Sequence, residues 1–327
     1  MQIGKIPGDK LEEIILNKTG YRRDDVLLHA ALGEDSAVVD LGDSLLVISS
    51  DPITGANNDS GYIAVHVACN DLAAAGAEPV GIQVILLLPE EMKESDIAKL
   101  MDEISTTATE INVEVLGGHT EILSSVNKAI ICITAVGKAP KNMYVTSSGA
   151  VPGNDLIVTK GVGIEGTYIL ANDHRDMLLE NGVPQDIILK AVDFRNKLSV
   201  IKEGQIAACL GASAMHDITE GGLYGALDEL SKASGVGFCI DQDKVPILNE
   251  TRIISEVFSI DPLGLISSGS MLITSADGES LVEKLKEEDI FAVKIGNITT
   301  GEKSIIHKGE KIAFQWTNKD ELWRLME

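Results

Sequence analysis

The stretch "SGYIAVHVACNDLAAAGAEP", residues 60–79, decides how this chain is interpreted. Its apolar residues favour a helix that ends in the Gly76–Pro79 region. Asn70 and Asp71 interrupt that helix. Because burying an unpaired carboxylate costs several kcal/mol, such a group normally has a partner or a metal. Basic residues are scarce, which favours a metal as the partner of Asp71. A neighbouring arginine or a backbone amide is the alternative partner.

The segments around this helix predict a mixed α and β unit. Two short strands joined by a turn precede the helix, and the periodicity of the following residues predicts a strand, a second helix capped by Ser95, and two more strands. The expected order is therefore β-β-α-β-α-β-β. The strands are expected at 36–41, 44–50, 81–89, 113–118 and 128–139, and the second helix at 93–112.

A second unit follows a stretch rich in Ser, Gly and Pro, which predicts domains at 1–147 and 148–327. It is expected to begin with a buried strand at 155–160 and to continue with helices. A strand end then leads into a helix at 213–234, and late strands follow at 270–276, 291–298 and 303–309. Strands that return without regular β-α alternation favour an α+β fold over a doubly wound sheet.

Composition narrows the classes of partner. The 327 residues, 44% of them hydrophobic, suffice for two domains with their own cores. Lys and Arg number 27 against 50 Asp and Glu, a formal net charge of -23, which argues against nucleic acid. No apolar run is long enough to span a membrane. The four cysteines form no C-x-x-C pair and are expected to be buried free thiols, as in a cytoplasmic protein.

The most conspicuous glycine motif is "GVGIEG", in which Gly161, Gly163 and Gly166 have the spacing G-x-G-x-x-G. A dinucleotide-binding turn would be followed by a second strand that ends in an acidic residue. The residues after Gly166 are charged or helical instead, which leaves a NAD-linked oxidoreductase with the least support. Two other interpretations of the motif remain. It is either a tight turn before a helix or a loop that offers backbone N–H groups to another phosphate.

Acidic residues beside glycines recur along the chain. Each has an ordinary alternative as a turn residue or a helix cap, and His119 alone is more often structural. Together they suit Mg²⁺, which takes oxygen ligands and is usually shared with substrate phosphates. No Walker motif or kinase catalytic-loop signature is present. The candidate metal ligands are Asp35, Asp51, Asp71, Glu121 and Asp217.

Five short segments, in this order, make the chain similar to the superfamily of aminoimidazole ribonucleotide (AIR) synthase. Within that superfamily the chain most resembles the hydrogenase maturation factor HypE and the AIR synthase-related proteins grouped with it. The segments are "GEDSAVVD" (33–40), "SSDPI" (49–53), "NDLAAAGAEP" (70–79), "GGHTE" (117–121) and "HDITEGGL" (216–223).

The resemblance implies a two-domain α+β subunit. Its N-terminal domains would pair into a dimeric β-barrel with ATP at or near the interface, and its C-terminal domain would be an α+β sandwich. It also implies an enzyme that uses ATP and Mg²⁺ to phosphorylate or activate a small-molecule or protein-borne acceptor. Asp35, Asp51, Asp71 and Asp217 would then be Mg-phosphate ligands, with Asn70 orienting one of them. Gly117, Gly118, His119 and Thr120 would border the nucleotide, and Gly161 and Gly163 would cover the substrate side.

Three departures from the family pattern leave alternatives open. The resemblance to HypE implies a C-terminal cysteine that receives a carbamoyl group. In this chain the last cysteine is Cys239. A nucleotide-binding accessory factor in maturation, without turnover of its own, is therefore an alternative. No cysteine precedes Cys69, which argues against selenophosphate synthesis. His119 stands where relatives have Asp, so Glu121 could replace that ligand, and either Asp217 or His119 could accept the acceptor's proton.

Overall fold

The computed structural model describes residues 6, 8–53, 58–316 and 319–325. Its first half confirms the predicted β-β-α-β-α-β-β order and adds a short helix and a strand before it. The elements are α1 (Gly8–Ile14), a 3₁₀ turn η1 (Leu16–Lys18), β1 (Val26–Leu28), β2 (Ala37–Asp40), β3 (Leu45–Ile53), α2 (Ser60–Ala74), β4 (Glu78–Pro89), α3 (Glu94–Glu110), β5 (Glu114–Leu123) and β6 (Ile130–Ala139).

The second half confirms the expected strand, helices and late strands, and adds elements that the sequence did not signal. Its first part comprises η2 (Ser147–Gly149), β7 (Asp155–Thr159), α4 (Ile164–Asp173), α5 (Arg175–Glu180), α6 (Gln185–Val192), η3 (Asp193–Lys197), α7 (Ile201–Cys209), β8 (Ala214–Ile218) and α8 (Gly222–Ser234). The remainder comprises β9 (Gly237–Asp241), η4 (Gln242–Lys244), α9 (Asn249–Phe258), η5 (Pro262–Gly264), β10 (Ser270–Ser275), α10 (Gly278–Glu287), β11 (Ala292–Thr299), β12 (Lys303–His307), β13 (Glu310–Ala313) and α11 (Glu321–Arg324).

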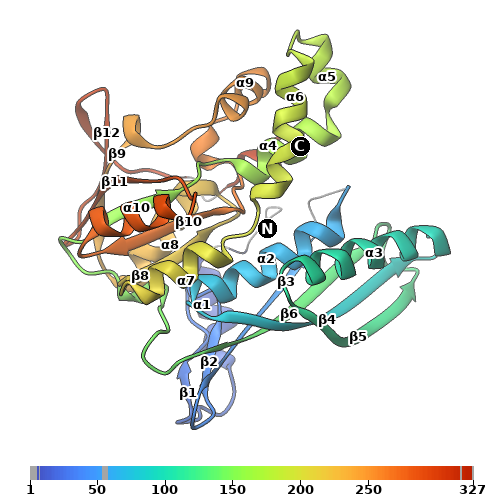
Figure 1. Ribbon diagram of the computed structural model, residues 1–327, viewed down its shortest axis with the longest axis horizontal. Helices are drawn as coiled ribbons and strands as arrows, with labels where there is room; N and C mark the ends of the chain where they lie inside the picture. Colours follow the sequence, from blue (N-terminus) through green and yellow to red (C-terminus); the bar gives the residue numbers. More distant parts are fainter. Residues whose placement is uncertain (1–5, 7, 54–57, 317–318, 326–327) are drawn as a thin grey trace.

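Each half of the chain has one sheet, so the fold is α+β with two domains. The N-terminal sheet has the order β1-β2-β3-β6-β4-β5, in which only the β4–β5 pair is parallel. The C-terminal sheet has the order β13-β12-β9-β11-β7-β10-β8. In Figure 1 the first sheet lies below α2 and α3, and the second lies among α7, α8 and α10. The division after residue 147 stays a prediction.

Helix α2 is central to both domains. Every residue from Gly61 to Ala74 is buried. Ala64, Ala68 and Leu72 belong to the core over the N-terminal sheet, whereas Ala73 and Ala74 belong to a core with α7 and α10. A helix that is apolar all round is a buried helix, and this arrangement explains the composition of residues 60–74.

Strand β7 is also covered on both faces. Leu156 and Val158 pack with α8, whereas Ile157 packs with α7 and α10. This double burial explains the continuous apolar run at its sequence, since alternating residues of a strand point to opposite faces.

Two local expectations were wrong. Helix α3 begins at Glu94 after Lys93, and Ser95 is inside the helix rather than at its cap. Among the four cysteines, Cys69 is buried but Cys209 is exposed, because it lies at the end of α7. All four are free thiols, as expected. None of the helices in the described part of the chain combines the length and apolar composition needed to cross a membrane.

Candidate functional site

A cavity of about 450 Å³ lies between the two domains. Among the described residues, all the charged side chains that line it are carboxylates. The N-terminal domain contributes Glu34, Asp35, Ser49, Asp51 and Asp71, and the C-terminal part of the chain contributes Glu165, Ile169, Thr219, Glu220, Ile266, Ser268, Leu322 and Trp323. Three of the predicted aspartates therefore meet in one place, although they come from three separate segments.

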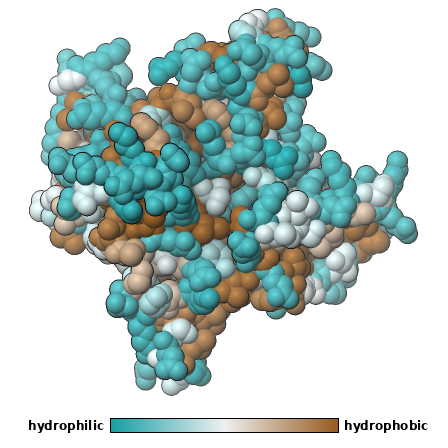
Figure 2. All heavy atoms as spheres, viewed as in Figure 1, coloured by the Kyte–Doolittle hydropathy of each residue, from teal (hydrophilic) through white to brown (hydrophobic). Residues whose placement is uncertain are grey.

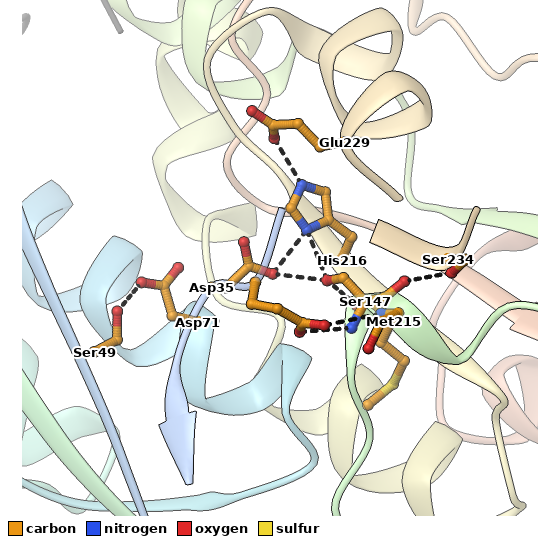
Figure 3. Close-up of polar contacts among 10 residues, drawn as sticks. Asp35, Ser49, Asp71, Ser147, Met215, His216, Glu229 and Ser234 are labelled. Carbon is orange, nitrogen blue, oxygen red and sulfur yellow. Dashed lines mark hydrogen bonds and ion pairs between the residues drawn. The ribbon is translucent and has the colours of Figure 1, made fainter. Parts of the chain in front are cut away.

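Asp71 is the most deeply buried of these three. It lies on α2 with 7% of its surface exposed, and it accepts a hydrogen bond from the Ser49 hydroxyl on β3 (Figure 3). Burial raises the pKa of the Asp71 carboxyl well above its usual range, and the negative charges of Asp217, Asp51 and Asp35 raise it further. The structure thus places all four predicted aspartates close enough to interact.

Asp217 reaches this group from the other domain. It lies in β8, whose five residues are all buried, and only 1% of its surface is exposed. It is not part of the cavity lining. Its charge acts on Asp71 from behind the cavity wall.

These residues fit a divalent cation that arrives with a phosphate. Within the described residues, no three His, Cys, Asp or Glu side chains are arranged to hold a metal by themselves. Mg²⁺ does not require such a cage, since it commonly takes one or two carboxylates together with phosphate oxygens and water. The raised pKa of Asp71 is a sign of negative charge that a cation would offset.

Asp35 is held by a histidine of the C-terminal domain (Figure 3). His216 Nδ1 lies 2.7 Å from Asp35 Oδ2, and His216 Nε2 lies 2.9 Å from Glu229 Oε2. Burial alone lowers the pKa of His216, but Asp35 and Glu229 together raise it well above its usual value. The carboxylates at hydrogen-bond distance from both ring nitrogens therefore favour the imidazolium form of His216. It joins β8 and α8 to the loop before β2.

The neighbouring loop strengthens this contact between domains. Ser147 Oγ lies 3.1 Å from His216 Nδ1 and donates to the Met215 carbonyl at 3.0 Å. The backbone N–H groups of Ser147 and Ser148 each donate to Glu34 at 3.1 Å. Glu34 thus anchors η2, and both Glu34 and Asp35 line the cavity.

Asn70 has a different position from the one expected. It is fully buried, its Nδ2 donates to the Leu198 carbonyl at 2.8 Å, and its Oδ1 accepts from the Val200 N–H at 2.9 Å. It does not line the cavity. In the structure Asn70 fastens α2 to the segment before α7, so its predicted role in orienting a ligand gains no support from the geometry.

The "GGHTE" segment, residues 117–121, lies far from the aspartates of the same chain. It is inside the edge strand β5, and the side chains of His119 and Glu121 are 66% and 53% exposed. Asp51 pairs with Ile133, Ile133 with Val84, and Val84 with Gly118. Three strand spacings separate Asp51 from Gly118, about 14 Å. Gly117, Gly118, His119 and Thr120 do not line the cavity that holds Asp51, and their contact with a nucleotide stays a prediction.

The glycines of "GVGIEG" allow a left-handed backbone turn and close packing at the start of α4. Gly163 has φ 70° at the start of α4, and a Cβ on Gly166 would lie 2.4 Å from Leu265 Cγ. Gly161 and Gly163 do not line the cavity, but Glu165 in the first turn of α4 does. Both neighbours of β7 in the sheet, β10 and β11, are antiparallel to it. Strand β7 therefore lacks the adjacent parallel strand that the β-α-β unit of a dinucleotide-binding turn requires.

Several residues of the site were missed in the sequence. His216 is part of the segment "HDITEGGL" but was given no role, and Glu229 lies beyond the end of that segment. The available signal for their contact was their position, since Glu229 lies on the helix that follows the strand of His216. Ser49, Glu165 and Ser268 gave no signal of their own, because their roles depend on which segments meet at the cavity.

Family comparisons agree with this architecture. Residues 33–139 match the N-terminal domain, and residues 151–308 the C-terminal domain, of the AIR synthase related proteins. A protein of Methanocaldococcus jannaschii named for hydrogenase expression/formation is 28% identical over 93% of this chain and 90% of its own length. The carbamoyl dehydratase HypE of Azotobacter vinelandii is 26% identical over 89% of this chain and 87% of its own.

Solved structures share the fold. HypE in a HypE–HypF complex superposes with a TM-score of 0.77 at 21% identity, covering 94% of this chain and 99% of that one. HypE in complex with ATP gives 0.71 at 20% identity, covering 87% and 89%. AaThiL complexed with AMPPCP and TMP gives 0.72 at 21% identity, covering 90% and 92%. The two domain matches cover most of the chain, and it belongs to the AIR synthase related family.

Proposed function

We propose that this protein is an ATP- and Mg²⁺-dependent enzyme that phosphorylates or activates a small-molecule or carbamoyl-type acceptor. The observation that carries the proposal is the meeting of Asp35, Asp51 and Asp71 at one interdomain cavity, with Asp217 behind it. A triphosphate could enter such an acidic cavity only with cations that offset its charge.

The comparisons support the nucleotide. HypE has been solved with ATP, and AaThiL with AMPPCP, and both share the fold of this chain over most of its length. HypE relatives are named carbamoyl dehydratases, which supports an acceptor with a carbamoyl-type group.

In this proposal Asp35, Asp51 and Asp71 hold Mg²⁺ together with the phosphates of ATP, and Asp217 adds its negative charge from behind the cavity wall. The ion would supply charge neutralisation at the transferred phosphoryl group. The chain's own residues do the positioning. Ser49 orients the Asp71 carboxylate, and the imidazolium of His216 orients Asp35. Of the two residues considered as proton acceptor, Asp217 lies at this site, and His119 reaches it only if another subunit provides it.

We propose further that two subunits pair through the N-terminal sheet. Strand β5 is an exposed edge, and apolar side chains remain exposed near it: Val80 is 42%, Ile85 39% and Leu116 50% exposed. Figure 2 shows hydrophobic residues reaching the surface in the lower part of the view, where Figure 1 places this sheet. Pairing would cover this edge and bring Gly117–Glu121 of one subunit toward the cavity of the other.

Substitution of Asp71 by Asn tests the enzymatic role. The amide keeps the size and the hydrogen bond with Ser49 but loses the charge that would hold Mg²⁺. Loss of several kcal/mol of charge stabilisation predicts a fall in ATP hydrolysis of about 100-fold or more. The measurement is steady-state release of ADP, with Asp102→Asn on the exposed face of α3 as the matched control.

Normal turnover in Asp71→Asn would show that the metal assignment is wrong. Tight ATP binding by the unchanged protein without hydrolysis, across a panel of amide and carbamoyl acceptors, would instead favour a nucleotide-binding accessory factor.

A further inference from the structure

The cavity has two unlike walls. The N-terminal domain provides the aspartates to which the proposed function assigns Mg²⁺ and phosphate. The opposite wall comes from the C-terminal domain and includes the start of α4, the loop after β8, the loop before β10 and α11. Glu165 on α4 and Ser268 on the loop before β10 are its deepest polar side chains, with 4% and 1% of their surface exposed.

The position of Glu165 is fixed by backbone contacts. The Ser268 N–H donates to Glu165 Oε2 at 3.3 Å, and the Gly166 N–H donates to the Ile266 carbonyl at 2.9 Å. The Ile164 N–H donates to Ser267 Oγ at 3.3 Å. Because Gly166 has no Cβ, the first turn of α4 can lie directly against Leu265. The glycine motif thus places a carboxyl group at the cavity wall.

Glu165 lacks the partner that a buried glutamate of purely structural role would have. Glu203 is equally buried, and Lys160 Nζ lies 2.6 Å from its Oε1. Within residues 8–53, 58–316 and 319–325, Glu165 forms no ion pair and accepts a hydrogen bond from the Ser268 N–H. Burial raises the pKa of the Glu165 carboxyl, and the charge of Glu220 raises it further. A buried carboxyl without a cation is costly unless a ligand uses it.

We propose that Glu165 determines which acceptor the enzyme takes: it accepts a hydrogen bond from an uncharged acceptor and excludes anionic ones. This inference rests on the proposed function, since it assumes that ATP and Mg²⁺ occupy the aspartate wall. An anionic acceptor beside Glu165 and Glu220 would meet like charges, and the described cavity lining offers it no Lys, Arg or His. An uncharged N–H or O–H group would pair with Glu165, and a site built for such a donor strongly rejects analogues without it.

Binding of matched amides and carboxylates tests this assignment. The probes are benzamide with benzoate and acetamide with acetate, measured by saturation-transfer NMR on the full chain with Mg²⁺ and a non-hydrolysable ATP analogue. The unchanged protein should bind each amide at least about tenfold more tightly than its carboxylate. In Glu165→Gln that ratio should fall but stay above one, because the Gln amide can donate to a carboxylate while Glu220 still repels it.

The control is Glu283→Gln on the exposed side of α10, which should keep the ratio of the unchanged protein. Equal binding of amide and carboxylate, no binding of either amide to the protein that holds the ATP analogue, or an unchanged ratio in Glu165→Gln would each overturn the assignment. If Glu165→Gln fails to fold, the ratio of amide to carboxylate affinity in the unchanged protein decides whether the assignment holds. Failure to bind the ATP analogue would instead overturn the proposed function.

Discussion

His216 shows how a single residue can connect two domains at a functional site. Its ring lies between Asp35 of the N-terminal domain and Glu229 of α8, at 2.7 and 2.9 Å. The sequence predicted Asp217, its neighbour, as the functional residue. Because the side chains of consecutive strand residues point to opposite faces, His216 and Asp217 act in different directions. That division of roles could not be read without knowing what each face of β8 packs against.

Asp320 provides a pH-dependent contact near the same site. Its carboxylate accepts hydrogen bonds from the N–H groups of Gly221, at 2.5 Å, and Leu322, at 2.7 Å. Burial raises the pKa of Asp320 to about 7, although these hydrogen bonds act to lower it. The folded protein therefore holds a proton here that the unfolded chain releases at lower pH.

The unchanged protein should lose stability as pH rises because Asp320 titrates. Replacement of Asp320 by Asn should abolish this part of the pH dependence. The carboxyl titrates at about pH 4 when unfolded and at about pH 7 when folded. Between these values the folded state binds more protons, so the free energy of unfolding falls as pH increases. Asn keeps the cap of α11 but does not titrate. Thermal unfolding across this interval should show that the stability of the variant relative to the unchanged protein increases toward neutral pH. The opposite trend would contradict the assignment.

Among the elements, α2 was the most predictable from sequence. Its uniform apolar composition already indicated burial, and the structure confirms this on all sides. The partners of its two polar residues were not predictable. Asn70 binds the backbone of residues 198–200, and Asp71 faces the cavity, yet both are adjacent polar residues in the same apolar run. Which one reaches a cavity depends on the direction each takes from the helix and on segments far away in the chain.

Strand β5 is expected to contribute to the site of a second subunit. If Gly117–Glu121 completes the cavity of another subunit, two inactive variants should restore one another. Asp71→Asn damages a cavity, whereas His119→Ala combined with Glu121→Ala damages the segment that a subunit donates. In a mixed dimer one of the two sites is intact, so random pairing predicts recovery of about a quarter of the normal ATP hydrolysis.

The measurement is ADP release after the two variants are mixed, exchanged and compared with each alone. Activity no greater than that of the separate variants would contradict donation between subunits. Full activity in the His119→Ala, Glu121→Ala variant by itself would show that this segment takes no part.

In the whole molecule, the order of elements followed from periodicity, since long apolar and amphipathic segments signal helices and strands locally. The arrangement of the site did not. Asp35, Asp51 and Asp71 were predicted together because they are acidic and lie in suggestive settings, and the fold does bring them to one cavity. The "GGHTE" segment looked equally suitable, but the strand order β3-β6-β4-β5 places it three strands away from Asp51. Sheet order is a long-range property that the local sequence does not encode.

We propose that the interdomain aspartates bind the phosphates of ATP through Mg²⁺. The decisive experiment is calorimetric titration of the full protein with a non-hydrolysable ATP analogue, with and without Mg²⁺. We predict binding that depends on Mg²⁺ and that weakens by about tenfold or more in Asp71→Asn. Binding of equal strength without Mg²⁺, or unchanged by Asp71→Asn, would contradict the claim.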